Sequence, residues 1–320
     1  MYTVSETPRP LGDLSALPPF CQEAWIDIYQ KHFKGELRFF HLLKNNTLQA
    51  LLPLHIRKMG PLTKAFTPFS QPLAGPFFYH PEESPRRWSE KQRHWRVKCL
   101  ALTEYLQTRY SSVQLGPDAY AYETFSNQNW QALPQPHYFY NPEAEPDFEL
   151  RTVATIKKAI KAGFKVEECS TLPEFGQWYE QLYKQNNIPL TLSPQILAAY
   201  QSDLIQAGLI QAIKVVDQNN LNQAFLSYFS WEGGKMLFPW HSCQSPESKT
   251  GSTLTFHHLA LLGQQKQMRV NFGGGIDPSL LLFKEQFSNS IENFYTLKKF
   301  RSLPEKIVLN TATTLHKMFA

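Results

Sequence analysis

The stretch VNFGGGIDPSLLLFKEQF, residues 270–287, joins a short apolar strand to three glycines, an Asp-Pro turn and an apolar segment with Lys284 in its middle. The chain has only 15 glycines in 320 residues, so three at one strand end are unusual. Glycines there let the backbone approach a ligand, because no Cβ stands in the way. A sharp turn that needs positive φ before Asp277 explains them equally well. The lysine also has two interpretations: it snorkels to a surface carboxylate, or it enters a cleft beside the glycines.

The bulk composition is that of a globular protein, with 42% hydrophobic and 18% charged residues. The four cysteines are scattered without a C-x-x-C pair, so we expect reduced thiols and no metal site. No apolar run approaches the roughly 20 residues that span a bilayer, and the first residues lack the features of a secretory signal. These observations predict a cytoplasmic protein. A net charge of +5 suits an anionic ligand, such as a phosphorylated cofactor or a nucleic acid, but alone decides nothing.

Periodicity and turn residues predict alternating strands and helices. Residues 37–43 and 48–56 read as a hairpin, followed by a helix over 88–109 and a strand over 112–116. Residues 131–147 are rich in proline and are the best linker candidate. The second part of the chain predicts helices over 151–161, from Thr171, and from Ser193 to Gly208, then strands over 209–216, 221–231 and 235–242, a helix over 252–267 and a strand over 268–272.

An internal repeat suggests how these elements are grouped. NNTLQALLPL (45–54) and NNLNQAFLSY (219–228) share five of ten residues. Each is followed by a long helix and a short strand that ends in glycine, Gly116 in one copy and Gly273 in the other. The pattern predicts a duplicated α/β domain, with one copy in residues 1–142 and the other in 143–320.

The order of elements over 209–273 resembles the core of the GNAT acyltransferase fold. The whole chain resembles the FemAB-like proteins, which carry two GNAT domains in tandem. Three stretches carry the resemblance: IKKAIKAGFKVEE (156–168), NFGGGIDPSLLLFKEQF (271–287) and LQALLPLHIRK (48–58). It implies an α/β protein of two tandem GNAT-like domains, with mixed central sheets flanked by helices.

The chain departs from the family pattern at three positions. Asn271 stands where the family commonly has an acid, Ser288 where it has a glycine, and Val153 where it has an arginine. The missing acid, and the missing spacing of a pyrophosphate-binding loop, keep open a second interpretation. The chain would then be a non-catalytic binding scaffold that retains the GNAT fold.

As an enzyme, the resemblance implies a bacterial, cytoplasmic transferase that moves an acyl group from acyl-CoA or aminoacyl-tRNA to a small-molecule amine. Such transfer needs no enzyme nucleophile, because the amine attacks the thioester or ester directly. The sequence leaves open the choice of donor, the role of tRNA as a partner and the oligomeric state, of which a monomer is one option.

Two residues are candidates for catalysis. The resemblance places Lys284 near the reacting groups, where its ammonium could steady the oxyanion of the tetrahedral intermediate. His241, at a strand end, could act as the general base that deprotonates the amine. A half-buried histidine making one hydrogen bond is the alternative for that position.

Two further groups are candidates for binding. Lys249 and the amides of Gly251, Ser252 and Thr253 lie at a helix start, where orphan N–H groups and the helix dipole favour an anionic part of the donor. An ordinary serine N-cap explains the same residues. Substrate binding is assigned to Asn271, Gly273, Gly274 and Gly275. We expect no metal ligands.

The segment SPRRWSEKQRHWRVK (84–98) interleaves cations with Trp88 and Trp95. It could contact an RNA backbone and stack on bases. Its helical spacing is equally consistent with buried tryptophans and a solvated basic face.

Overall fold

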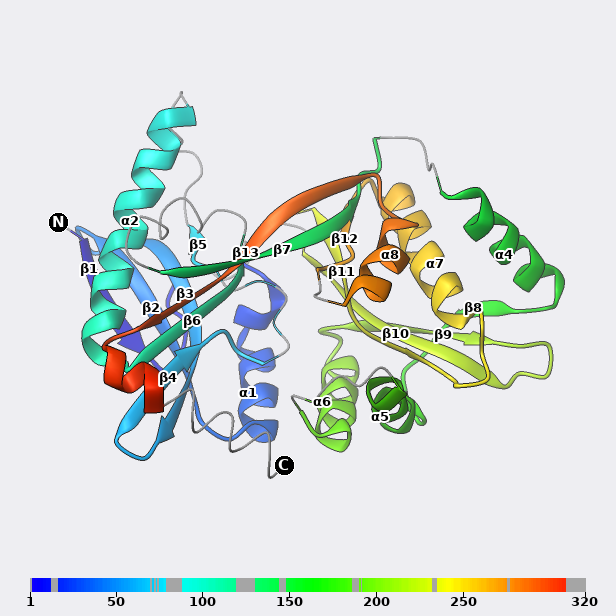
Figure 1. The fold of residues 1–320 in the computed structure, drawn as a ribbon, viewed down its shortest axis with the longest axis horizontal. Helices are drawn as coiled ribbons and strands as arrows, with labels where there is room; N and C mark the ends of the chain where they lie inside the picture. The colour runs from blue at the N-terminus through cyan, green and yellow to red at the C-terminus, as the bar shows by residue number, and fades with distance from the viewer. Residues whose placement is uncertain are drawn as a thin grey trace. The chain divides into compact units, whose positions relative to one another are not determined.

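The computed structural model describes residues 2–12, 17–69, 71, 73, 75–78, 88–118, 130–143, 148–185, 190, 192–231, 235–274 and 277–308. The chain forms two compact units, each assembled from separated stretches (Figure 1). Unit 1 comprises residues 1–14, 34–135 and 293–320, and unit 2 comprises residues 15–33 and 136–292.

Unit 1 is built on a mixed sheet. Its strand order is β1-β2-β3-β4-β6-β13, in which β4 and β6 are parallel and the other neighbours antiparallel. The turn between β2 and β3 has Asn45 and Asn46 at φ 49° and 63°, which is the conformation of a tight hairpin turn. The strands are β1 (Tyr2–Thr7), β2 (Glu36–Lys44), β3 (Thr47–Met59), β4 (Leu62–Phe66), β5 (Phe77–Phe78, paired with β3), β6 (Ser112–Asp118) and β13 (Ser290–Phe300).

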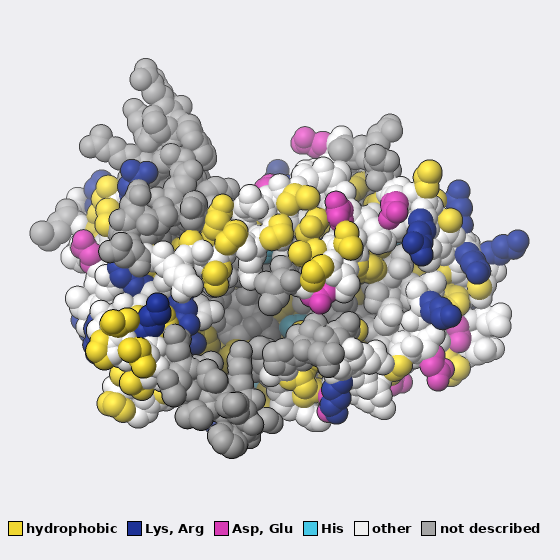
Figure 2. Space-filling view, viewed as in Figure 1, with side chains coloured by type: hydrophobic (Ala, Val, Ile, Leu, Met, Phe, Trp, Pro, Cys, Tyr) yellow, Lys and Arg dark blue, Asp and Glu magenta, His cyan; other side chains and the backbone are white. Residues whose placement is uncertain are grey.

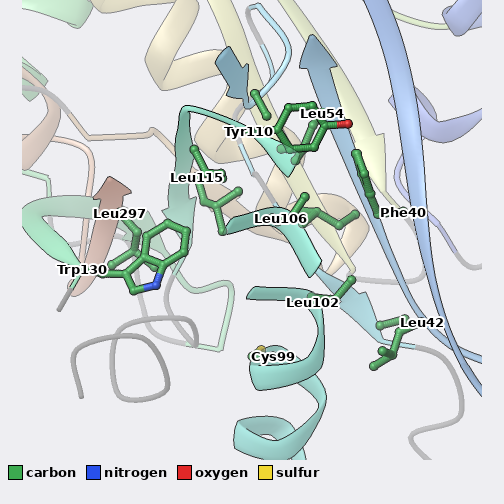
Figure 3. Packing of buried hydrophobic residues seen from close by; sticks show 14 of the residues in the cluster. Phe40, Leu42, Leu54, Cys99, Leu102, Leu106, Tyr110, Leu115, Trp130 and Leu297 are labelled. Atoms are coloured by element: carbon green, nitrogen blue, oxygen red, sulfur yellow. The ribbon is translucent and has the colours of Figure 1, made fainter. Parts of the chain in front are cut away.

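The core of unit 1 lies between this sheet and helix α2 (Trp88–Arg109) (Figure 3). Every second residue of a strand faces α2, so Leu52, Leu54 and Ile56 of β3 are buried on the same side. Leu102 and Leu106 come from the helix, and Leu297 comes from β13, where it lies beside Trp130. The final strand of the chain is therefore part of this core.

Unit 2 has a sheet of the same plan. Its order is β7-β12-β11-β10-β9-β8, in which β11 and β12 are parallel and the other neighbours antiparallel. The strands are β7 (Gln131–Tyr140), β8 (Lys165–Glu168), β9 (Gln211–Val216), β10 (Asn222–Trp231), β11 (Met236–Gln244) and β12 (Arg269–Asn271). The helices are α1 (Glu23–His32, after the short 3-10 helix Pro19–Cys21), α4 (Leu150–Lys161), α5 (Phe175–Gln185), α6 (Pro194–Gln206), α7 (Gly251–Lys266) and α8 (Pro278–Glu285).

Helices cover both faces of the unit 2 sheet (Figure 1). On β10, Leu226 packs with Phe256 and Leu259 of α7, whereas the next residue to the N-terminal side, Phe225, packs with α5. Helix α1 joins this unit through α6, where Lys31 Nζ donates to Asp203 Oδ2 at 2.7 Å. Two helical layers therefore bury the sheet that carries the candidate site.

The predicted α/β fold class is confirmed: the strands form one long mixed sheet, and the strand order within unit 1 is equivalent to that within unit 2. The predicted linker at 131–147 is wrong over residues 131–140, which form β7; Phe139 and Tyr140 pair with Asn271 and Val270 of β12. The proline-poor end of that stretch makes these pairs, because proline lacks the N–H that a ladder needs. The order of elements along the chain also does not predict the two units. Helix α1 belongs to unit 2, although it lies in the first half of the sequence, and most of β13 belongs to unit 1, although it lies in the second half. The boundary between residues 142 and 143 stays a prediction about the duplicated halves.

Candidate active site

Unit 2 contains a hollow of about 490 Å³. Its walls come from α5, from the second half of β11, from the start of α7 and from α8. The lining residues are Tyr179, Leu182, Tyr183, Pro239, Trp240, His241, Ser242, Gln244, Lys249, Ser252, Thr253, Phe256, Phe272, Asp277, Ser279, Leu280, Phe283 and Lys284. Its size is that of a site for a small organic ligand.

The hollow forms where two parallel strands part. β11 and β12 pair only at Met236–Arg269 and Leu237–Val270, after which β12 ends while β11 continues to Gln244. A bulge at Trp240 interrupts β11, because Ser227 of β10 faces His241 while Tyr228 faces Pro239. Bulges re-aim side chains, and here His241 and Ser242 line the hollow.

The glycine segment after β12 is held by Asn271 and lies against His137. Gly273 has φ +74°, and its N–H donates to Asn271 Oδ1 at 2.8 Å. His137 Nδ1 of β7 lies 3.2 Å from the same oxygen. A Cβ on Gly274 would come within 2.6 Å of His137 Cδ2 and 2.7 Å of the Pro136 carbonyl oxygen. Glycine is thus required for backbone approach to β7; Gly275 lies outside the described residues.

Lys284 turns inward from α8 and reaches these glycines. Asp277 caps the helix, its Oδ1 accepting the Leu280 N–H at 3.0 Å, and Pro278 fills the first helical position. Lys284 is 8% exposed, and its Nζ donates to the Gly274 carbonyl at 2.7 Å. No described carboxylate forms an ion pair with it, and burial lowers its pKa to about 8. A cation without a carboxylate partner among the described residues therefore lies in the wall of the hollow.

Two histidines near the hollow are held neutral. Burial, and then the charge of Lys284, lower the pKa of His137 to about 4. Burial lowers the pKa of His241 to about 3. His241 Nε2 is buried, with no hydrogen-bond partner among the described residues. A neutral imidazole has one unprotonated ring nitrogen, which can accept a hydrogen bond at neutral pH.

The start of α7 is largely satisfied by its own neighbours. The Gly251 N–H donates to Ser248 Oγ at 3.1 Å, and the Ser252 N–H to Gln244 Oε1 at 3.0 Å. Gly251 is buried, whereas Lys249 is exposed at the rim of the hollow. Lys249 and Thr253 also line a second hollow of about 960 Å³ beside α4. Lys and Arg side chains gather on the outer side of α4 (Figure 2).

Five predicted residues thus line one hollow: Lys284, His241, Lys249, Ser252 and Thr253. Asn271, Gly273 and Gly274 connect to it through Lys284, while Gly251 packs against Ala224 outside it. Sequence reasoning missed His137, since its stretch read as a linker. A polar residue after Pro136 and before the apolar Tyr138 to Tyr140 is the signal that could have found it. Of the basic segment 84–98, only the side chains from Arg96 onward are described, so its RNA-binding interpretation lies outside the described residues.

No protein-family model matches the chain, and no curated protein matches it. Solved structures do. The crystal structure of FemX is 13% identical, with a TM-score of 0.59 over 90% of this chain and 92% of FemX. L-PGS from Bacillus licheniformis is 13% identical, with a TM-score of 0.52 over 91% of this chain and 96% of that one.

The chain has the tandem GNAT-like fold of FemX. A conserved protein of unknown function from Bacteroides thetaiotaomicron shares it at 9% identity, with a TM-score of 0.52 over 91% and 92% of the two chains. Within the described part of this FemX-like chain, no helix is both long and apolar enough to cross a membrane. Nor do the described residues contain a cluster of His, Cys, Asp or Glu that could hold a metal ion.

Proposed function

We propose that this chain transfers an acyl or aminoacyl group from an activated ester or thioester to an amine in the hollow of unit 2. The observation that carries the proposal is Lys284, a buried ammonium that lies in the wall of a ligand-sized hollow and has no counter-ion among the residues that the structure describes. Burying such a charge is costly unless it is paired or hydrogen-bonded. A reaction that develops negative charge beside it would supply the missing partner.

The chemistry follows from the donors on Lys284. One of its three N–H groups is held by the Gly274 carbonyl, which fixes the ammonium and leaves two donors. The neutral amine attacks the carbonyl carbon, and its oxygen takes the negative charge that the ammonium stabilises. As the tetrahedral intermediate collapses, the bond to the donor oxygen or sulfur breaks, and the proton lost by the amine goes to that leaving group. The products are an amide and a free hydroxyl or thiol.

His241 is proposed to hold the attacking amine. Its imidazole is neutral at physiological pH and its Nε2 has no partner among the described residues. It can therefore accept a hydrogen bond from the attacking amine. A pKa of about 3 makes it a weak base in the empty site, so we assign it orientation of the amine through this hydrogen bond, while the proton passes to the leaving group.

The donor is proposed to pass the rim of the hollow at Lys249 and Thr253. Of the two donor classes, the start of α7 favours aminoacyl-tRNA over acyl-CoA. A pyrophosphate held by the amides of Gly251 and Ser252 would displace the side chains of Ser248 and Gln244. We propose a small-molecule amine as the acceptor and the bacterial cytoplasm as the compartment of the reaction.

The test is a transfer assay that crosses acyl-CoA and aminoacyl-tRNA donors with a panel of amines. We expect amide formation with at least one pair, and Lys284→Met supplies the background with the fold retained. A non-catalytic scaffold would bind donors and give equal product with wild type, Lys284→Met and buffer alone.

A further inference from the structure

We propose that the hollow takes a bulky apolar acyl group, aromatic or branched aliphatic, rather than a small or a cationic one. This inference rests on the proposed function, because it names the group that is moved. It is carried by the composition of the walls and by the charges that face the hollow.

One wall is a cluster of phenyl rings. Phe256 of α7 stacks on Phe272 with ring centroids 5.4 Å apart, and its edge meets Phe283 of α8 at 5.0 Å. All three rings line the hollow. Leu280, 40% exposed, adds an aliphatic surface on the same helix as Phe283.

The facing wall is also aromatic. Tyr179 and Tyr183 of α5 have ring centroids 4.4 Å apart, and their hydroxyls bond to each other at 2.7 Å. That mutual bond satisfies a polar atom of each ring, so the rings can present apolar surface to a ligand. Burial also raises the pKa of Tyr179 well above its usual value, so its hydroxyl stays neutral.

The rings and the Lys284 ammonium share one hollow. Phe256, Phe272, Phe283 and Lys284 all line it, and Phe283 and Lys284 both come from α8. With the carbonyl oxygen of the donor placed at the Lys284 ammonium, the acyl substituent is the part of the donor that enters the space between the aromatic walls.

The charges exclude a cationic side chain. Asp277 is the only carboxylate among the residues that line the hollow. Its Oδ1 already accepts from the Leu280 N–H and the Ser279 hydroxyl as the cap of α8. Lys249 and Lys284 face the same space and would repel a lysine-like group. A glycyl or acetyl group would leave most of the 490 Å³ filled with water.

The experiment measures binding without requiring turnover. Calorimetry compares the N-acetyl amides of phenylalanine, leucine, glycine and lysine as probes. We expect the phenylalanine and leucine probes to bind on the order of 10- to 100-fold more tightly than the glycine probe, and the lysine probe to bind most weakly.

Two matched variants locate the effect. Leu280→Trp fills the hollow and should weaken the phenylalanine probe about tenfold, with little change for glycine. Leu282→Trp is the control, because Leu282 is 62% exposed on the same helix but lines the hollow beside α4 instead. Equal binding of the glycine and phenylalanine probes, tightest binding of lysine, or equal effects of the two variants would overturn the inference. Retained probe order without transfer from any donor would contradict the proposed function alone.

Discussion

The two units share one strand order but differ around the second strand of the parallel pair, which is β6 in unit 1 and β12 in unit 2. In unit 1, Gly116 lies within β6, and a Cβ there would come within 2.7 Å of Thr296 on β13. In unit 2 the segment after β12 reaches Gly274, and a Cβ there would meet Pro136 and His137 on β7. Glycine therefore has the same structural role in both units: it lets the backbone approach the neighbouring strand, β13 in unit 1 and β7 in unit 2.

What differs is what lies beyond that glycine. In unit 2, His137 takes the place that Thr296 has in unit 1, and α8 follows and brings Lys284 to the Gly274 carbonyl. The parallel pair β11 and β12 also parts after two residue pairs, whereas β4 and β6 pair at three and β4 then ends. The common strand order explains why both units need a glycine at this place. Lys284, and the part of β11 that continues beyond its pairing with β12, distinguish unit 2, which carries the candidate site.

The largest expected difference is between Lys284, which is buried in unit 2, and Lys64, which is half-buried in unit 1. Lys284→Met should lower kcat/KM about 10²–10³-fold, because one preorganised donor to the oxyanion is lost. Lys64→Met is the control: Lys64 lies on β4 of unit 1, and burial and then the charges of Lys298 and Arg57 lower its pKa. It should change kcat/KM by no more than about twofold. Similar losses in both variants would show that the effect is structural.

The stability of the protein should respond to pH through Lys284. Burial lowers its pKa from 10.5 to about 8, so between these values the unfolded chain binds more protons than the folded one. The free energy of unfolding should therefore rise with pH across that window, by at most about 3 kcal/mol. Urea unfolding of wild type and Lys284→Met at pH 7.5 and 10 checks this. A difference between the two proteins that stays constant with pH would contradict a buried, charged Lys284.

Alanine at the two closely packed glycines, Gly116 and Gly274, sharpens the comparison. Gly116→Ala and Gly274→Ala should each lower the free energy of unfolding by about 1–3 kcal/mol, since the added Cβ overpacks against the neighbouring strand. Only Gly274→Ala should also lower the transfer rate, because its carbonyl positions Lys284. Thermal unfolding and kcat, measured on the same samples, separate the two effects. Equal loss of rate in both variants would end the distinction.

The smallest effect is expected at the rim of the hollow. Lys249→Ala should weaken donor binding by roughly 1–2 kcal/mol at low salt and less at high salt, as expected for an exposed, charge-assisted contact. Lys266→Ala, at the other end of α7 and also exposed, is the matched control. Unchanged donor affinity in Lys249→Ala would place the anionic part of the donor elsewhere.

Much of this arrangement could be predicted from local patterns. The repeated Asn-Asn turns of the two copies are real: Asn46 and Asn220, at equivalent positions, both have positive φ, 63° and 59°. The glycine-and-lysine stretch also led to Lys284. Leu280 belongs to the apolar segment around Lys284, yet it is 40% exposed and lines the hollow, because helical periodicity does not distinguish a cavity wall from a core.

The rest depended on contacts between distant residues. His137 could not be found because the prolines of its strand suggested a linker, and only the pairing with β12 makes that segment a strand. The amides of Gly251 and Ser252 read as an anion site, but their acceptors are Ser248 Oγ and Gln244 Oε1. Gln244 comes from β11, so its role needs the tertiary fold. Strand β7 of the first half pairs with β12 of the second half, and β13 of the second half pairs with β6 of the first. The order of the strands along the chain does not predict these pairings.

The central claim is that the Lys284 ammonium is buried beside Gly274 and faces the ligand. An NMR titration of the lysine side chains measures this directly, with the Lys284 resonance assigned by its absence in Lys284→Met. We predict a pKa of about 8 for Lys284 in the free protein, and a change in its resonance when N-acetylphenylalaninamide binds. A pKa near the usual 10.5, with a resonance that the ligand leaves unchanged, would contradict the account.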